Sequence, residues 1–190
     1  GMLQVFGAYP SFIAYFSDLG PVNEGDSTLS HYIMVEWAKG GDLSDVVAGR
    51  NKATLAQKYE LFYGILRGVE LLHGRNIVHR DLKPQNILVS VPCGFGIPCV
   101  AKLGDLGYAC QLRGLPMFDG VRACKGKRGT PWYMAPETYT YGIIDPKNDV
   151  WALGLILFEL TFNTLPKKFA TTTNLRALKD DVALFDIRSD

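Results

Sequence analysis

The stretch IVHRDLKPQNILV, residues 77–89, constrains the fold of this chain more than any other part of the sequence. Six of the eight residues from position 79 to 86 carry charged or polar side chains, and short apolar runs lie on either side. These residue types at this spacing are typical of a loop, so we expect a loop between the apolar runs. Binding and catalytic residues concentrate on such loops, which makes residues 79–86 the first candidate site.

The size and composition indicate a single globular domain. The chain has 190 residues, enough for one hydrophobic core, with 47% hydrophobic and 21% charged residues. The net charge of +1 argues against a dedicated nucleic-acid-binding protein, which usually carries a strong basic excess. Four cysteines are too few for a disulfide scaffold at this length.

The sequence predicts no membrane segment. Its longest apolar run, Val150 to Leu157, is far shorter than the ~20 residues that a bilayer requires. The apolar N-terminus lacks a basic region and is interrupted by Pro10, so we interpret it as core and not as a signal peptide. We therefore expect an intracellular, cytoplasmic protein with reduced thiols and with neither a nucleic acid nor a membrane as its partner.

The first part of the chain is predicted to form strands. Residues 11–16 and 31–37 are rich in aromatic and β-branched side chains, and the turn-forming residues between them predict a loop. A short helix is expected to start near Asp42. Residues 86–89 and 100–103 flank a segment with Gly and Pro, which predicts a short hairpin.

Two helices are predicted further along the chain. The first spans residues 54–74, with a capping box at Thr54 and Gln57 and an end at Gly74. Its expected apolar face consists of Leu55, Tyr59, Phe62, Leu66 and Val69. The second spans residues 149–162, which are apolar almost all round and therefore typical of a central buried helix. Between these helices, residues 108–137 predict a long functional loop, and residues 171–190 predict one further helix.

The residue types around the 79–86 loop suit phosphoryl transfer. That reaction needs a positioned hydroxyl, metal ions on the phosphates and positive charge where negative charge develops. Asp81 can orient the hydroxyl or accept its proton, and Lys83 can reach the transferring phosphate. Asn86 and Asp105 offer oxygen atoms, which are the ligands that Mg²⁺ prefers.

Four motifs follow one another in the order found in eukaryotic protein kinases: HRDLKPQN at 79–86, DLG at 105–107, GTPWYMAPE at 129–137 and DVWALG at 149–154. The chain resembles the large C-terminal lobe of that family, preceded by two strands of the small lobe. The resemblance implies an α+β, protein-kinase-like fold with a mostly helical C-terminal lobe. Residues 1–38 would be a remnant of the small lobe with the hinge, and residues 39–190 a large lobe that is incomplete at its C-terminal end.

The resemblance also implies roles for individual residues, with ATP and Mg²⁺ as cofactors. Asp81 resembles the catalytic aspartate and Lys83 the phosphate-neutralising lysine, while Asn86 and Asp105 resemble the metal ligands. The ATP pocket would contain the gatekeeper Val35, the hinge residues Glu36 and Ala38, the ribose contact Asp42 and the pocket floor Leu88. Supporting roles are implied for Thr130 and Glu137 in the segment before and within APE, for His79 and Leu106 in a hydrophobic spine, for Arg80 as a phosphate contact, and for Asp149 as the anchor of the loop.

The substrate class follows from the same resemblance. Lys83 and Thr130 stand where serine/threonine kinases have them, so the expected partner is a protein with a serine or threonine acceptor. The DLG, GTPWYMAPE and DVWALG motifs together are similar to those of NIMA-related kinases.

Several parts of the family pattern are absent from this sequence. No G-x-G-x-x-G motif precedes the hinge, no VAIK-type lysine precedes Ser11, and the arginine that normally pairs with Glu137 would lie beyond residue 190. We therefore keep two hypotheses: an ATP-dependent serine/threonine kinase, and a catalytically inactive fragment or pseudokinase that acts as a protein-binding module. Every catalytic position of the large lobe carries the competent residue type, which favours the first hypothesis.

The segment between Gly107 and Gly129 contains no serine or threonine. The resemblance implies that Arg80 grips a phosphate on this segment, yet only Tyr108 and Thr130 could carry one. Our hypothesis is that the segment is ordered without serine/threonine phosphorylation. Stoichiometric phosphate on Thr130 in phosphosite mapping of active protein would contradict it.

Simpler structural roles compete with some of these assignments. Asp42 could cap the short helix instead of contacting ribose, and Asp149 could cap its helix and anchor the loop at once. Cys93 and Cys99 could pair or bind metal, but no second ligand pair has zinc spacing, so we expect free thiols. A basic cluster, either a solvated loop or a docking patch for acidic substrates, is formed by Arg122, Lys125, Lys127 and Arg128.

Overall fold

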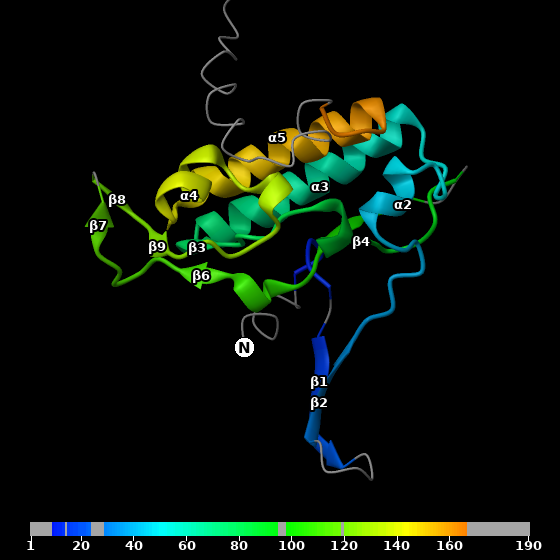
Figure 1. Ribbon diagram of the computed structural model, residues 1–190. Coiled ribbons are helices and arrows are strands. Elements are labelled where there is room, and N and C mark those ends of the chain that lie inside the picture. The colour runs from blue at the N-terminus through cyan, green and yellow to red at the C-terminus, as the bar shows by residue number, and fades with distance from the viewer. Residues whose placement is uncertain (1–8, 14, 24–28, 95–97, 119, 167–190) are drawn as a thin grey trace, which may run out of the picture.

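The computed structural model describes residues 9–13, 15–23, 29–94, 98–118 and 120–166 (Figure 1). The helix predicted within residues 171–190 lies outside this part of the chain. The helices of the described residues are α2 (Leu43–Val47), α3 (Leu55–His73), α4 (Pro136–Tyr141) and α5 (Pro146–Phe162). Three short 3₁₀ helices are η1 (Pro84–Asn86), η2 (Leu106–Tyr108) and η3 (Pro131–Tyr133).

The strands form small antiparallel pairs, so the described residues hold no large sheet. β1 (Tyr15–Asn23) pairs with β2 (Leu29–Val35), and β4 (Ile87–Val89) pairs with β5 (Ala101–Leu103) as predicted. The predicted long loop contains short strands of its own. These pairs are β3 (Ile77–Val78) with β6 (Cys110–Gln111), β7 (Met117–Phe118) with β8 (Val121–Arg122), and β9 (Cys124–Lys125) with β10 (Ile143–Ile144).

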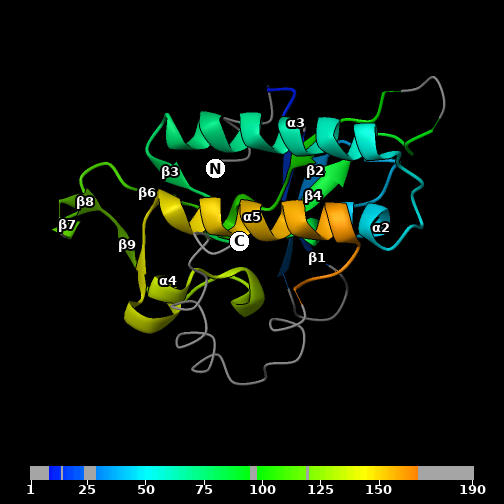
Figure 2. The same ribbon diagram turned by 90° about the horizontal axis from the view of Figure 1, so that it is seen from above.

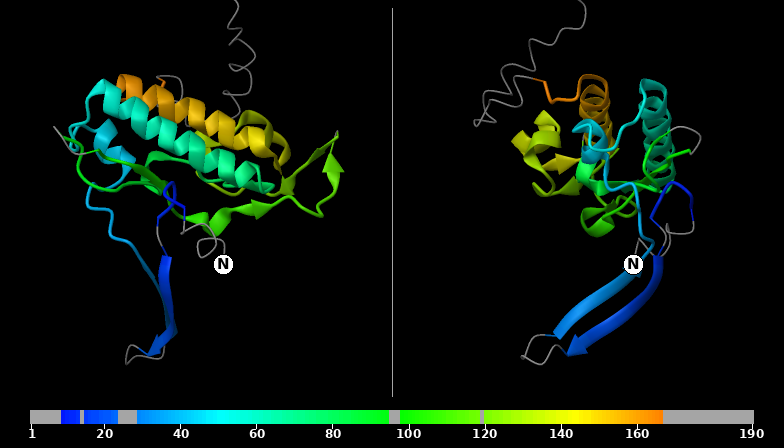
Figure 3. Two further views of the ribbon diagram at one scale, coloured as in Figure 1. Left: turned by 180° about the vertical axis from the view of Figure 1, so that it is seen from behind. Right: turned by 90° about the vertical axis from the view of Figure 1, so that its right-hand side faces the viewer.

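The positions of the first two strands differ from the prediction. β1 begins at Tyr15 and runs to Asn23 through the predicted loop, and β2 ends at Val35. Residues 11–13 instead lie along β5, where the Ile13 nitrogen donates to the Leu103 carbonyl at 3.0 Å and Phe12 is fully buried. The β1–β2 pair projects away from the helical body (Figures 1 and 3).

Helices α3 and α5 run side by side over the core (Figure 2). The capping box of Thr54 and Gln57 and the end of α3 at Gly74 are confirmed. The predicted apolar face of α3 is wrong at three positions, because Leu55, Tyr59 and Leu66 are 54%, 49% and 39% exposed. Its other two residues, Phe62 and Val69, pack on the core as predicted. The side that packs includes Gly68, where an added Cβ would lie 2.7 Å from a methyl carbon of Leu103 on β5. The buried positions of α3 are Leu61, Ile65, Gly68, Val69 and Leu72.

Helix α5 begins earlier than predicted. Asp145 is its N-cap, accepting a hydrogen bond from the Lys147 nitrogen at 2.7 Å, so the N-cap interpretation of Asp149 is wrong. The expectation that α5 is buried all round is also wrong, since Val150 and Phe162 are 57% and 61% exposed. The buried side of α5 packs on the core beside α3, and α5 also contacts η3, where the Tyr133 hydroxyl donates to Glu159 at 2.7 Å.

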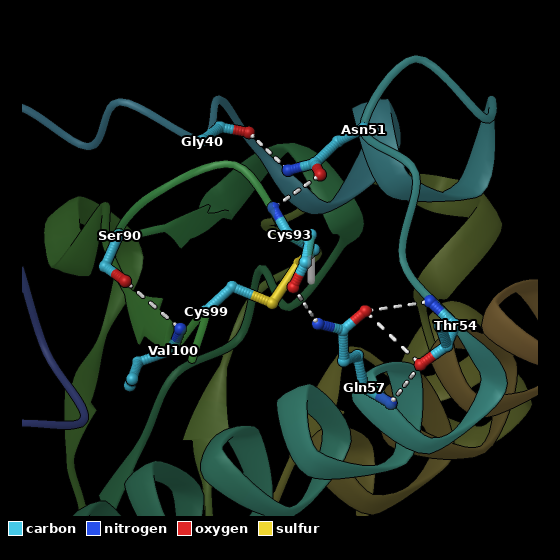
Figure 4. Close-up of a disulfide and its surroundings, with 9 residues drawn as sticks. Gly40, Asn51, Thr54, Gln57, Ser90, Cys93, Cys99 and Val100 are labelled. Carbon is cyan, nitrogen blue, oxygen red and sulfur yellow. Dashed lines mark hydrogen bonds between the residues drawn. A yellow bond between two sulfur atoms is a disulfide. The ribbon is translucent and has the colours of Figure 1, made fainter. Parts of the chain in front are cut away.

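The turn between β4 and β5 contains a disulfide between Cys93 and Cys99, so the prediction of free thiols is wrong (Figure 4). Their Cα atoms are 5.1 Å apart, within the usual range for disulfides. Asn51 fixes the turn by accepting from the Cys93 nitrogen at 2.8 Å and donating to the Gly40 carbonyl at 2.9 Å. A second disulfide joins Cys110 to Cys124, and no described cysteine is free.

Candidate active site

The 79–86 loop is fixed from below by Asp149 on α5. The fully buried carboxylate of Asp149 accepts from the backbone nitrogen of His79 at 2.8 Å and from that of Arg80 at 3.0 Å. The Nε2 atom of His73, in the last turn of α3, lies 2.9 Å from the same carboxylate. One aspartate therefore ties α3, α5 and the start of the loop together. The sequence predicted Asp149 as an anchor but gave no role to His73, whose only signal was its place at the helix end.

His79 joins the loop to the segment that carries Asp105. Its ring is fully buried, and Nε2 lies 3.0 Å from the carbonyl oxygen of Gly104. A carbonyl can only accept, so Nε2 carries the proton and Nδ1 is free to accept from the Asp81 nitrogen at 3.4 Å. Leu106 is also buried, which agrees with the packing role expected for both residues.

Asp81 lies at the centre of a dense hydrogen-bond network. Its side-chain oxygen Oδ1 accepts from the backbone nitrogen and the hydroxyl of Thr130, both at 2.7 Å. Its other oxygen, Oδ2, accepts from the Asn86 amide at 2.9 Å and lies 3.0 Å from the ammonium of Lys83. Lys83 also donates to the Thr130 hydroxyl at 2.8 Å. The structure thus brings together four residues that the sequence singled out from two distant motifs.

This network keeps the Asp81 side chain ionised although only 3% of the residue is exposed. Burial by itself raises the pKa of Asp81, but the hydrogen bonds from Thr130 and Lys83 and the charge of Lys83 outweigh it, so the pKa lies below its ordinary value. A carboxylate in this state accepts hydrogen bonds and can accept a proton as a reaction proceeds.

Gly129 makes the contact between Thr130 and Asp81 possible. Its φ of +115° is unfavourable for other residues, and a Cβ at this position would overlap the carbonyl oxygen of Arg80. The segment can therefore approach the loop closely only with glycine here. No role for Gly129 was predicted from the sequence, although its place in GTPWYMAPE was an available signal.

The donor set of Asn86 and Asp105 fits a hard divalent cation. The amide nitrogen of Asn86 donates to the backbone oxygen of Asp81 at 2.8 Å as well as to its carboxylate, which leaves the amide oxygen of Asn86 for a metal. Asp105 is exposed, and one of its oxygens accepts from the Gly107 nitrogen at 3.3 Å. One carboxylate, one amide oxygen, phosphates and water are a typical Mg²⁺ environment. The described residues contain no cluster of three or more His, Cys, Asp or Glu.

Three of the residues expected around adenine lie at the end of β2 or directly after it. Val35 is 36% exposed, while Glu36 and Ala38 are half-buried. Glu36 forms an ion pair with Lys102 of β5 at 2.8 Å, a contact that the sequence did not predict. After Ala38, the backbone of Gly40 donates to the Val89 carbonyl at 3.0 Å and so holds this segment against β4.

Asp42 and Leu88 lie opposite each other in an isolated antiparallel bridge. The helix-capping role of Asp42 is confirmed, because its side chain accepts from the Ser44 nitrogen at 2.8 Å and Asp45 completes a capping box. A contact between Asp42 and ribose stays a prediction. Leu88 is half-buried, on the same strand that follows the 79–86 loop.

Arg80 has an unusual environment. Its φ is +74°, and its buried Nε and Nη2 atoms have no hydrogen-bond partner among the described residues. Burial lowers the pKa of its guanidinium, the charge of Arg128 lowers it further, and the charge of Asp149 opposes both effects. The arginine that was expected to grip a phosphate therefore has no anionic partner of that kind in the described chain.

The basic cluster and Glu137 are exposed. Arg122 donates to the Leu115 carbonyl at 2.9 Å, and the Lys127 ammonium lies 5.1 Å from the centre of the Tyr139 ring. These local contacts are compatible with both interpretations of the cluster. Glu137, for which an arginine partner was expected from the resemblance, is exposed in this structure.

Within the described residues, no helix combines the length and the apolar character needed to cross a membrane.

Comparison with known proteins identifies what the chain is similar to. The family model described as "Protein kinase domain" matches residues 20–188. The chain is 36% identical over 159 residues to serine/threonine-protein kinase DCLK2 of Rattus norvegicus, covering 82% of this chain and 19% of that protein. It is 36% identical over 135 residues to SNF1-related protein kinase catalytic subunit alpha KIN12 of Arabidopsis thaliana, covering 71% and 25%. It is 35% identical over 152 residues to serine/threonine-protein kinase ULK1 of Homo sapiens, covering 77% and 14%.

The chain thus spans a quarter or less of the length of these three relatives. Their names do not include the NIMA-related group, so the similarity to that group stays a prediction.

Proposed function

Because this chain belongs to the protein kinase domain family, we propose that it transfers the γ-phosphate of ATP to serine and threonine hydroxyls of protein substrates. One observation carries the proposal above the others. The Asp81 carboxylate is buried, ionised and held by Thr130, Asn86 and Lys83, which come from two motifs almost fifty positions apart. A buried network whose polar groups are all paired holds its side chains in one arrangement. Positioning of this kind is most of what phosphoryl transfer requires.

In this proposal Asp81 orients the acceptor hydroxyl and takes its proton. The Lys83 ammonium, held 3.0 Å from Asp81 and 2.8 Å from the Thr130 hydroxyl, places a positive charge beside the path of the transferring group. A lysine at this point serves as a point charge for a phosphoryl group whose negative charge increases during transfer. Thr130 fixes both residues, so its hydroxyl is already occupied and we infer that it is not a phosphorylation site.

Asn86 and Asp105 would hold Mg²⁺, which when bound supplies charge neutralisation to the phosphates of ATP. The amide of Asn86 is oriented by its two hydrogen bonds to Asp81. Asn86 would therefore link the Mg²⁺ site to the proton acceptor Asp81. Asp105 has a φ of +46°, and η2 starts directly after it. That strained conformation directs the side chain of a residue that would otherwise continue β5.

Residues 1–38 are proposed as a small-lobe remnant with the hinge, and residues 39–190 as an incomplete large lobe. Glu36 and Ala38 would offer backbone groups to adenine, with Val35 as gatekeeper and Leu88 beneath the ring. Asp42 would approach ribose while it caps α2. The substrates would be intracellular proteins, and the protein itself an intracellular enzyme.

The proposal is tested by thermal unfolding with and without Mg²⁺-ATP, followed by a transfer assay. Ligand at ~100 times its dissociation constant stabilises a protein by about 2.7 kcal/mol, which for this size is a shift of roughly 5–10 °C. The shift should disappear in Asp105→Asn. Labelled phosphate transferred to a protein mixture should appear on serine and threonine.

A cooperative transition without any shift would favour the inactive binding module over the kinase. Transfer to tyrosine alone would contradict the substrate class while preserving the enzyme class.

A further inference from the structure

The segment from Asp105 to Glu137, here called the Asp105–Glu137 segment, is closed by the disulfide between Cys110 and Cys124. Cys110 lies on β6, which pairs with β3 directly before His79. Cys124 lies on β9, which pairs with β10. Thr130 follows Cys124 by six residues in the chain. The disulfide therefore joins the strand pair that leads into the 79–86 loop to the strand pair that leads into the Thr130 contact.

Besides the disulfide, this end of the segment is held by short strand pairs and single backbone contacts. The Leu112 nitrogen donates to the Asn76 carbonyl at 2.7 Å, and the Gly126 nitrogen donates to the Gly142 carbonyl at 2.9 Å. The β3–β6 and β9–β10 pairs consist of two residue pairs each, and such short pairs are marginal when isolated. Between Cys124 and Thr130, Gly126 and Gly129 both have positive φ, at +107° and +115°. Glycines at such positions allow a linker to change direction easily. A covalent bond at Cys124 limits how far this linker can move from Asp81.

The surroundings of the disulfide form a small core of their own. Cys124 is 3% exposed and packs in a cluster with Val78, Leu112 and Ile144, whereas Cys110 is only partly buried at its edge. A partly exposed disulfide is the kind that small thiols and oxidants reach. Cys93 and Cys99, in contrast, are both buried, at 8% and 5% exposed.

The stretch between Gly107 and Gly129 contains no serine or threonine. Phosphoserine or phosphothreonine therefore cannot hold this stretch in place. Disulfides in intracellular proteins are mostly transient and serve catalysis or redox sensing. We propose that Cys110 and Cys124 are a redox-sensitive clasp, and that its oxidation holds Thr130 against Asp81 in the arrangement described above. This inference rests on the proposed function in that the site it regulates is the proposed catalytic one.

Two kinds of small oxidant can form the disulfide between Cys110 and Cys124. Hydrogen peroxide removes two electrons and two protons from the two thiols, which form one S–S bond while the peroxide becomes two waters. A low-molecular-weight disulfide does the same by exchange and leaves as two thiols. Reduction by an external dithiol reverses the step.

Peptide mapping without reduction tests whether the bond forms. Trypsin should release residues 103–113 and 123–125 as separate peptides from reduced protein and as one linked species after treatment with oxidised glutathione. Cys93 and Cys99 lie within one tryptic peptide, because no lysine or arginine lies between them, so the two disulfides are read independently. Absence of the linked species after oxidation would overturn the proposal.

Hydrogen exchange tests whether the bond acts on the site. In the oxidised wild-type chain, amides of residues 126–130 should exchange at least about tenfold more slowly than in the reduced chain. Cys110→Ser with Cys124→Ser should remove this response, and the matched pair Cys93→Ser with Cys99→Ser should retain it. The comparison of reduced and oxidised wild type needs no substitution, so it decides the matter even if a variant fails to fold.

Activity then separates the two proposals. Redox-dependent exchange at Thr130 without phosphoryl transfer in either state would leave the clasp standing and overturn the proposed function. Equal transfer rates and equal exchange in both redox states would overturn the clasp and leave the proposed function intact.

Discussion

The carboxylate of Asp149 accepts a hydrogen bond from the backbone nitrogen of His79 at 2.8 Å, although 70 positions separate them. A second bond to the Arg80 nitrogen makes the contact bidentate. The loop that carries Asp81 is thus shaped by a helix much later in the chain. Because Arg80 has a φ of +74°, the backbone here is held in a conformation that it would not adopt unsupported.

Replacing this anchor should therefore be costly. Asp149→Ala leaves two buried backbone donors without acceptors, each worth about 1–3 kcal/mol, so we expect the free energy of unfolding to fall by roughly 2–6 kcal/mol. Asp149→Asn keeps one acceptor oxygen and should lose about half as much. Urea unfolding measures both variants. A loss below ~1 kcal/mol in Asp149→Ala would show that the contact does not support the loop.

Gly129→Ala should separate Thr130 from Asp81, because its Cβ would overlap the Arg80 carbonyl oxygen. Gly126→Ala is a matched control, with a similar φ of +107° but no atom within 4 Å of the added Cβ. Both variants incur the backbone cost of about 1–2 kcal/mol, and Gly129→Ala should lose more than that in chemical unfolding. Equal losses in the two variants would remove close approach as the reason for glycine at position 129.

Glu159 should make stability fall as pH rises. Burial raises the pKa of Glu159, and the hydrogen bond from the Tyr133 hydroxyl at 2.7 Å opposes this only in part. The folded chain therefore keeps the proton at a pH where the unfolded chain, with a pKa of about 4.3, has released it. The contribution is complete below that pH and is lost as pH rises through the folded pKa.

Glu159→Gln cannot ionise, so its stability relative to wild type should improve as pH rises from the unfolded pKa of about 4.3 through the raised folded pKa of Glu159. Thermal or urea unfolding across this range measures the difference. A constant difference between the two proteins would mean that Glu159 does not titrate differently on folding.

The contribution of Asp81 to stability should depend on pH in the opposite direction from that of Glu159. Its pKa is lowered because the bonds from Thr130 and Lys83 outweigh the effect of burial. Its contribution to stability is therefore present above the unfolded pKa of about 3.9 and is lost as pH falls through the lower folded pKa. Asp81→Asn should show a weaker loss of stability in acid than wild type. Identical acid profiles would indicate that the Asp81 network does not favour the ionised form.

Local patterns in the sequence predicted the elements whose signals are short-range. The capping box at Thr54 and the start of α2 at Asp42 depend on residues within one turn, and both are confirmed. The buried side of α3 was not predictable from periodicity, because the helix has apolar residues on several sides and the choice is made by Gly68 against Leu103. Likewise, Cys93 and Cys99 pair because of a turn held by Asn51, a contact across 42 positions.

The candidate site follows the same division. Motif spacing pointed to Asp81, Lys83 and Thr130, and the structure brings them together. His73 and Gly129 were not predicted, since the role of each depends on a backbone or side chain far away in sequence.

The measurement that tests the central claim most directly is the rate of phosphoryl transfer to serine/threonine peptides by wild type and Asp81→Asn, with Mg²⁺-ATP binding measured in parallel. A positioned proton acceptor contributes about 10²–10⁴-fold, so Asp81→Asn should lose that factor in kcat while it still binds Mg²⁺-ATP. Glu70→Gln, a change at an exposed glutamate of α3 that pairs with Arg67, should leave the rate unchanged. Equal rates in wild type and Asp81→Asn, or ATP binding by wild type without any transfer, would contradict the account.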